Sequence, residues 1–166
     1  MSIQHCFGSG TVVSDLASSD KYDAIRELIR RARVFDEITD RDAFEEAVIA
    51  RERLQSTGLG HGVAVAHGRT PGTHRVLIAL GLSRDGIPFE SPDGERVQLL
   101  FLIASPPSMS LDYLQALSTL VRCVRLRSLR ESLFSAGSVD VVECRMREAL
   151  SGRAEKGEDC LPRQAC

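Results

Sequence analysis

Hydrophobic positions in the first third of the chain recur with the spacing of amphipathic helices. Between residues 21 and 34 they follow one another at intervals of three and four, and similar spacing returns over residues 40–54. This periodicity lines hydrophobic side chains along one side of a helix. Candidate capping residues stand ahead of both segments, within residues 17–20 for the first and at Thr39 or Asp40 for the second. The pattern predicts two helices.

The middle of the chain carries continuous apolar runs instead. Residues 75–83 have an unbroken apolar centre, which is typical of a strand buried on both faces of a sheet. Residues 97–104 form a second such run, and two prolines end it. Shorter strands are predicted over residues 11–16 and 63–66. The centre of the molecule is therefore expected to be a sheet.

Two segments between these strands are expected to be irregular. Residues 56–62 contain three glycines, a content that we interpret as too flexible for a helix or a strand. Residues 87–94 contain two prolines, which lack the backbone N–H that a sheet needs, so an edge or a turn is predicted there.

The last third of the chain is predicted to be helical. Leucine and valine recur at helical spacing from Leu111 to Leu133, and Ser138 is the expected cap of a last helix that ends at Leu150. Residues 151–166 are polar and without periodicity, so we expect a disordered tail after a domain spanning residues 1–150. Helices that flank a cluster of strands predict an α/β fold, a three-layer sandwich.

Composition excludes several classes of protein. The chain has 166 residues and a net charge of −2, whereas an electrostatic nucleic-acid binder is usually strongly basic. No apolar run approaches the roughly 18–20 residues that span a bilayer, and the first residues do not resemble a signal peptide. Five widely spaced cysteines without a C-x-x-C pair form neither a disulfide framework nor a zinc site. We expect a cytoplasmic protein without membrane insertion.

Candidate chemistry is concentrated in residues 56–69, which hold glycines, hydroxyl groups, His61, His67 and an arginine. Glycines let backbone N–H groups converge on phosphate oxygens. An unperturbed histidine has a pKa near 6.5, so much of it is neutral and nucleophilic at cellular pH. No lysine lies near these glycines and the third glycine of a dinucleotide fingerprint is missing, so neither nucleotide motif is present.

The stretch from Arg51 to Arg69, R-E-R-L-Q-S-T-G-L-G-H-G-V-A-V-A-H-G-R, resembles a known signature. It is similar to that of bacterial phosphotransferase-system (PTS) enzyme IIA domains of the fructose/mannitol and nitrogen-regulatory type. The resemblance covers roughly residues 10–150 and is closest to the nitrogen-regulatory branch. It implies a mixed β-sheet flanked by α-helices and a phosphoryl-accepting protein that needs no cofactor.

Site residues follow from this resemblance position by position. His67 corresponds to the histidine that accepts the phosphoryl group, and Arg51 to the arginine that neutralises its charge. Ser56, Thr57 and Gly58 correspond to the loop that offers backbone and hydroxyl donors. The implied phosphoryl donor is the carrier protein HPr or its nitrogen-branch analogue, and a regulated transporter or sensor kinase is a possible further partner.

The chain departs from the family pattern at two positions. Ala66 replaces a proline before the acceptor, and Tyr113 replaces a second histidine that orients and stabilises the first. A phenol donates a hydrogen bond but carries no positive charge. Two alternatives therefore stay open, a non-phosphorylated interaction module with a degenerate site and a sugar-specific IIA transport component. His61, His67 and His74 are not expected to converge on a metal ion.

Overall fold

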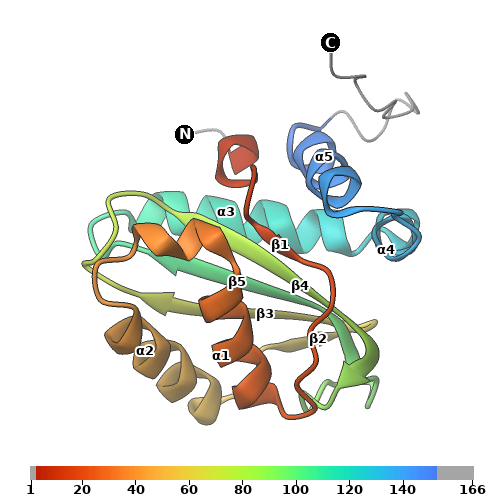
Figure 1. Ribbon diagram of the computed structural model, residues 1–166, viewed down its shortest axis with the longest axis horizontal. Coiled ribbons are helices and arrows are strands. Elements are labelled where there is room, and N and C mark those ends of the chain that lie inside the picture. Colours follow the sequence, from red (N-terminus) through yellow and green to blue (C-terminus); the bar gives the residue numbers. More distant parts are fainter. Residues whose placement is uncertain (1–2, 153–166) are drawn as a thin grey trace.

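The computed structural model describes residues 3–152, whose strands form one mixed sheet between two layers of helices (Figure 1). The strands lie in the order β1-β4-β5-β3-β2. Strand β3 runs parallel to β5 and β1 parallel to β4, whereas the β4–β5 and β2–β3 pairs are antiparallel. Their bounds are β1 (Val12–Val13), β2 (Gly58–Gly60), β3 (Val63–Arg69), β4 (Leu77–Ile87) and β5 (Val97–Ser105).

Helices α1, α2 and α5 begin where the sequence offers a capping side chain, whereas α3 and α4 begin without one. The Asp20 carboxylate accepts hydrogen bonds from the first-turn backbone of α1, Asp40 does so for α2 and Ser138 for α5, so the predicted caps are confirmed. The helices are α1 (Lys21–Arg31), α2 (Arg41–Leu54), α3 (Ser110–Val124), α4 (Arg127–Phe134) and α5 (Val139–Leu150), with short 3₁₀ turns η1 (Ile3–Cys6) and η2 (Arg33–Glu37).

The two faces of the sheet bury different helices. Side chains alternate between the faces of a strand. On β3, Ala64 and Ala66 pack into a core with α1, η2 and α2, whereas Val63 and Val65 pack into a second core with α3, α4 and α5. This arrangement confirms the predicted three-layer sandwich. By the same alternation His67 faces the α3 side of the sheet.

Several predicted bounds differ from the structure. The strand predicted over residues 11–16 is limited to Val12–Val13, and the strand predicted over residues 63–66 continues as β3 to Arg69, so that His67 lies within it. The glycine-rich segment predicted to be irregular includes a short strand, β2, because Val65 donates its backbone N–H to the Thr57 carbonyl and keeps the chain beside β3. His61, at a φ of 54°, lies in the turn between the two strands. Strand β4 continues to Ile87, which pairs with Val97, beyond the predicted end of the strand. The helical stretch after Leu111 is divided into α3 and α4.

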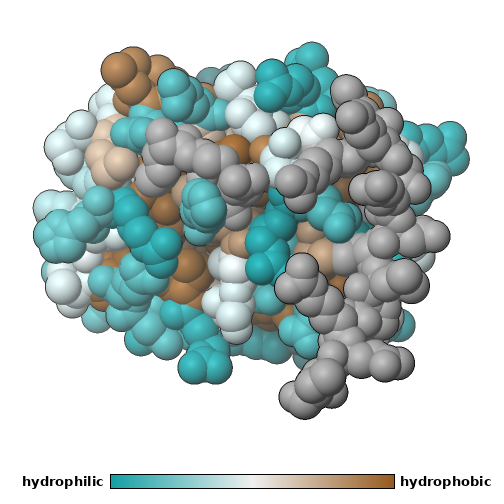
Figure 2. All heavy atoms as spheres, turned by 90° about the horizontal axis from the view of Figure 1, so that it is seen from above, coloured by the Kyte–Doolittle hydropathy of each residue, from teal (hydrophilic) through white to brown (hydrophobic). Residues whose placement is uncertain are grey.

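Helix α5 ends at Leu150, the predicted end of the last helix. Residues 151 and 152 form a turn, and the remainder of the predicted tail lies outside the described residues. No helix between residues 3 and 152 is long and apolar enough to cross a membrane. Figure 2 shows the face above η1 and α5, where, outside the area covered by grey atoms, hydrophilic residues surround smaller groups of hydrophobic ones.

Candidate functional site

Gly68 fixes how β3 presents its side chains. A Cβ atom at this position would lie 2.6 Å from a Val48 methyl group and 3.1 Å from the Phe44 ring, both on α2. Only glycine fits so close an approach without displacing the helix. The strand therefore rests on α2 at Gly68, and its neighbours His67 and Arg69 project from the opposite face.

His67 lies half-buried near the end of β3, with one ring nitrogen already occupied. Its Nδ1 is 3.3 Å from the Val65 carbonyl oxygen. Since a carbonyl only accepts hydrogen bonds, this contact assigns the hydrogen to Nδ1 and leaves the lone pair on Nε2. Burial lowers the pKa of His67, and the charge of Arg51 lowers it further against the opposing effects of Val65 and Glu52. The ring is therefore held in its neutral, nucleophilic form.

Tyr113 lies against the ring of His67. It comes from the first turns of α3, packs partly into the second core, and its ring centroid is 5.7 Å from that of His67 at an interplanar angle of 43°. Burial raises the pKa of Tyr113, while the charges of Arg51 and Arg69 act in the opposite direction. The structure thus brings the tyrosine to the place that the resemblance assigned to a second histidine.

Arg51 comes from the last turn of α2 and lies close enough to influence both rings. Its guanidinium donates a 3.0 Å hydrogen bond to the Gln55 carbonyl, which folds the side chain back over the end of its own helix. Its positive charge acts on His67 and Tyr113 alike. The predicted cation therefore acts on the predicted acceptor, although α2 packs on one face of the sheet and His67 projects from the other.

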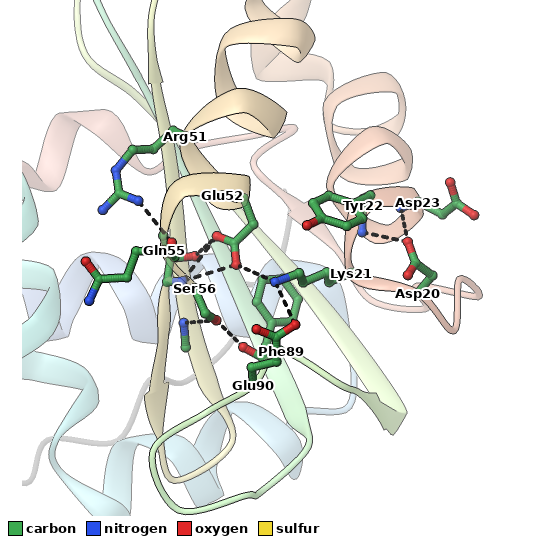
Figure 3. Close-up of polar contacts among 12 residues, drawn as sticks. Asp20, Lys21, Tyr22, Asp23, Arg51, Glu52, Gln55, Ser56, Phe89 and Glu90 are labelled. Atoms are coloured by element: carbon green, nitrogen blue, oxygen red, sulfur yellow. Dashed lines mark hydrogen bonds and ion pairs between the residues drawn. The ribbon is translucent and has the colours of Figure 1, made fainter.

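The adjacent Glu52 points away from Arg51 and into the protein (Figure 3). It is only 2% exposed, accepts hydrogen bonds from the Thr57 backbone N–H and hydroxyl, and forms an ion pair with the Lys21 ammonium at 3.3 Å. Lys21 also lies 3.4 Å from the exposed Glu90 carboxylate. This Lys21–Glu52 pair ties α1, α2 and the loop before β2 together.

The hydroxyl groups of Ser56 and Thr57, the predicted donors, make hydrogen bonds that hold the loop before β2 in place. The Ser56 hydroxyl donates to the Phe89 carbonyl, and the Thr57 hydroxyl donates to Glu52 at 2.6 Å. Within the described residues, no hydrogen bond joins either hydroxyl to His67. Both side chains therefore shape the loop here, and a role in direct phosphoryl binding would require them to exchange partners.

Gly58 is required by packing. A Cβ atom there would lie 2.6 Å from the Ser91 hydroxyl oxygen and 3.2 Å from the Phe89 carbonyl oxygen. Its backbone N–H points to the Ser56 hydroxyl oxygen at 3.3 Å. The glycine thus lets the start of β2 lie directly on the segment that joins β4 to β5.

Two further observations complete the site. Arg69, the arginine of the candidate segment 56–69 to which the sequence assigned no separate role, lies on the same face as His67, and the two-residue spacing on a strand was the signal that could have placed it there. Among residues 3–152, no group of three or more histidine, cysteine or acidic side chains is placed to hold a metal ion.

Several known proteins are similar to this chain in sequence and in fold. The family described as "Phosphoenolpyruvate-dependent sugar phosphotransferase system, EIIA 2" matches residues 6–144. The PTS system fructose-specific EIIABC component of Bacillus subtilis is 32% identical over 142 residues, covering 86% of this chain but only 22% of that protein. The Nitrogen regulatory protein of Bradyrhizobium diazoefficiens is 31% identical over 122 residues, covering 74% of this chain and 79% of that protein.

A solved structure agrees in its fold. The crystal structure of nitrogen regulatory protein IIA-Ntr from Neisseria meningitidis matches with a TM-score of 0.78 and 30% identity, over 89% of this chain and 98% of that one. The family match and the shared mixed sheet with its flanking helices agree. On this evidence the chain belongs to the EIIA type 2 family of the phosphoenolpyruvate-dependent sugar phosphotransferase system.

Proposed function

We propose that this protein is a cytoplasmic, nitrogen-regulatory IIA-like regulator that accepts a phosphoryl group on His67 from an HPr-type carrier. The observation that carries the proposal is the state of His67, a neutral half-buried imidazole with Nδ1 on the Val65 carbonyl and Nε2 free to react. Arg51 supplies positive charge beside it. The nitrogen-regulatory relatives support the regulatory branch.

The transfer step balances with the groups at this site. The Nε2 lone pair of His67 attacks phosphorus in line, the bond between phosphorus and the donor's histidine nitrogen breaks, and that nitrogen regains its electron pair. The His67 ring keeps its Nδ1 hydrogen, and the Val65 carbonyl stabilises the charge that develops on the ring. A phosphoryl group carries a charge of about −1.5 to −2, which Arg51 partly neutralises.

A carrier protein needs a surface on which to dock, and exposed apolar side chains neighbour two of the site residues along the chain. Leu54 is 84% exposed and follows Arg51 by three residues, while Leu111, 76% exposed, and the exposed Leu114 flank Tyr113. Exposed leucines gathered from two layers of the fold are typical of a protein-binding surface. They support a protein, and not a small molecule, as the phosphoryl donor.

The proposal is tested by incubation with phosphoenolpyruvate, enzyme I and an HPr-type carrier. We expect the intact mass to rise by one phosphoryl group, which is lost in acid, as a phosphohistidine requires, and which maps to the peptide containing His67. A protein that stays unlabelled with both HPr and its nitrogen-branch analogue would contradict the proposal and favour a non-phosphorylated interaction module.

A sugar-specific transport role is the second candidate. The similarity to the fructose-specific EIIABC component, at 32% identity, favours it. A transport component must pass its phosphoryl group on to a IIB protein. Incubation of the labelled protein with purified IIB proteins distinguishes the two roles, since transfer of label supports transport and retention supports regulation.

The burial of His67, together with the charge of Arg51, is expected to set the acid limit of the reaction. His67 has a lowered pKa, so its nucleophilic form persists below pH 6.5 and is lost only as the pH falls through that lowered value. Arg51→Gln removes a positive neighbour and raises the pKa of His67, so the neutral form is lost at a higher pH. Titration of the His67 ring protons by NMR measures this shift directly.

The same variant tests charge neutralisation. We expect the phosphorylation rate at neutral pH to fall about tenfold or more, the order expected for losing one charge-assisted contact. Arg53→Gln is the matched control, because Arg53 comes from the same helix turn but lies over Tyr22. Equal phosphorylation rates of Arg51→Gln and Arg53→Gln would show that Arg51 does not neutralise the phosphoryl group.

A further inference from the structure

Arg69 is held in a defined position although it is exposed. Its Nη1 donates a 2.8 Å hydrogen bond to the Ser110 hydroxyl and lies 3.4 Å from the Pro107 carbonyl oxygen. These contacts connect the end of β3 to the start of α3. They also place the guanidinium carbon 5.8 Å from the centroid of the Tyr113 ring, within the range of a cation–π contact.

Tyr113 therefore contacts both polar residues at the end of β3. His67 meets the ring at a centroid distance of 5.7 Å, and Arg69 meets it at 5.8 Å. Because Gly68 packs on α2, the strand presents these two residues together on the side of α3. The proposed phosphoryl transfer uses His67 and Arg51 but assigns no role to Arg69.

We infer that Arg69 is a positioning residue, which orients Tyr113 against His67 and supplies the positive charge that the phenol lacks. The inference rests on the proposed function. A phosphoryl group on His67 would bring close to two negative charges to this surface, and Arg51 neutralises only part of them. Arg69 and Tyr113 together combine a cation and a hydrogen-bond donor, the two properties of a protonated histidine.

The inference is tested by comparing the phosphorylation rates of four proteins, which are the wild type, Arg69→Gln, Tyr113→Phe and the double variant. We expect Arg69→Gln to lower the rate about tenfold, as for the loss of one charge-assisted contact. Tyr113→Phe should have an effect of similar size, and the double variant should be little slower than either single variant, because residues that act as one unit are not additive. If the rate of the double variant instead falls by the product of the two single-variant factors, the inference is contradicted.

Arg53→Gln is the matched control. Arg53 lies 5.7 Å from the ring centroid of Tyr22, nearly the distance at which Arg69 lies from Tyr113, yet it belongs to another pair. Its replacement should leave the rate unchanged. Arg69→Lys keeps the charge but loses the planar fork, so it should restore part of the rate. Equal melting temperatures among these variants exclude unfolding as the cause.

Tyr113→His provides a rescue that a structural role for Arg69 would not predict. An imidazole can itself carry positive charge, so in this background Arg69→Gln should lower the rate far less than it does in the wild type. The same tenfold loss in both backgrounds would show that Arg69 acts without Tyr113.

The phenol itself gives a readout independent of phosphate. The chain has two tyrosines, so Tyr22→Phe leaves Tyr113 as the single phenol that titrates by ultraviolet absorbance. Removing Arg69 should raise the pKa of Tyr113, because the positive charge favours the phenolate. An unchanged titration together with an unchanged rate overturns the inference alone, whereas no label on the wild-type protein overturns the proposed function as well.

Discussion

His67→Gln is expected to abolish acid-labile phosphorylation by the carrier, with a loss of at least about a thousandfold in rate. Glutamine preserves a polar side chain of similar reach but has no nitrogen lone pair that can attack phosphorus. The Val65 carbonyl, Arg51 and Tyr113 stay in place, so a positioned environment without a nucleophile remains. The measurement is the initial rate of label incorporation under conditions that saturate the wild-type protein.

His61→Gln is the control for this experiment. His61 is exposed and occupies the turn between β2 and β3 at a φ of 54°, away from the contact between His67 and Tyr113. Its replacement should leave the rate unchanged. Label that persists on His67→Gln would place the acceptor elsewhere in the chain. An unlabelled wild-type protein whose partner binding is unchanged by His67→Gln would instead favour an interaction module.

Glu52→Gln is expected to lower the free energy of unfolding by about 3 kcal/mol, the order found when one member of a buried ion pair is removed. Among residues 3–152, the change leaves the Lys21 ammonium with only the exposed Glu90 as an acidic partner. It also replaces two acceptor oxygens by one, although the Thr57 N–H and hydroxyl both donate to this side chain. Urea denaturation followed by circular dichroism measures the loss.

The same substitution at an exposed pair is the matched control. Glu131 pairs with Arg127 one turn away on α4, and both side chains are exposed, so Glu131→Gln should cost no more than about 0.5 kcal/mol. Adding Lys21→Met to Glu52→Gln removes the uncompensated charge and should recover part of the stability. If Glu52→Gln lowers the free energy of unfolding by as little as Glu131→Gln does, the buried Lys21–Glu52 pair does not hold the loop before β2.

Periodicity was sufficient to predict the layers of the fold and the ends of its most regular elements, but not its shortest strands. Side chains of α2 and β5 follow a hydrophobic pattern that only one packing satisfies, and both elements lie within a residue of their predicted ends. Strand β2 escaped prediction because its glycines carry no hydrophobic pattern, and pairing with β3 alone makes it a strand. Local composition cannot report a hydrogen bond to a neighbouring strand.

The candidate site was predictable in its residues but not in their partners. The spacing of Arg51 and His67 pointed to one site, and the charge of Arg51 does act on the His67 ring. The sequence gives no indication that Glu52 takes up the Thr57 hydroxyl, because Lys21, which completes that network, is 31 residues away along the chain. The partners of Arg69 were not predictable for the same reason, since they lie about 40 residues further along the chain, in α3 and just before it.

The close approach of Gly68 to α2 also bears on how the family can tolerate length changes. A one-residue insertion or deletion within β3 would shift every later side chain to the opposite face. His67 would then point into the core beside Phe44 and Val48, and a larger side chain would replace the glycine that rests on α2. A change of one residue in the length of β3 would therefore remove the nucleophile from the surface and disrupt the packing on α2 at the same time.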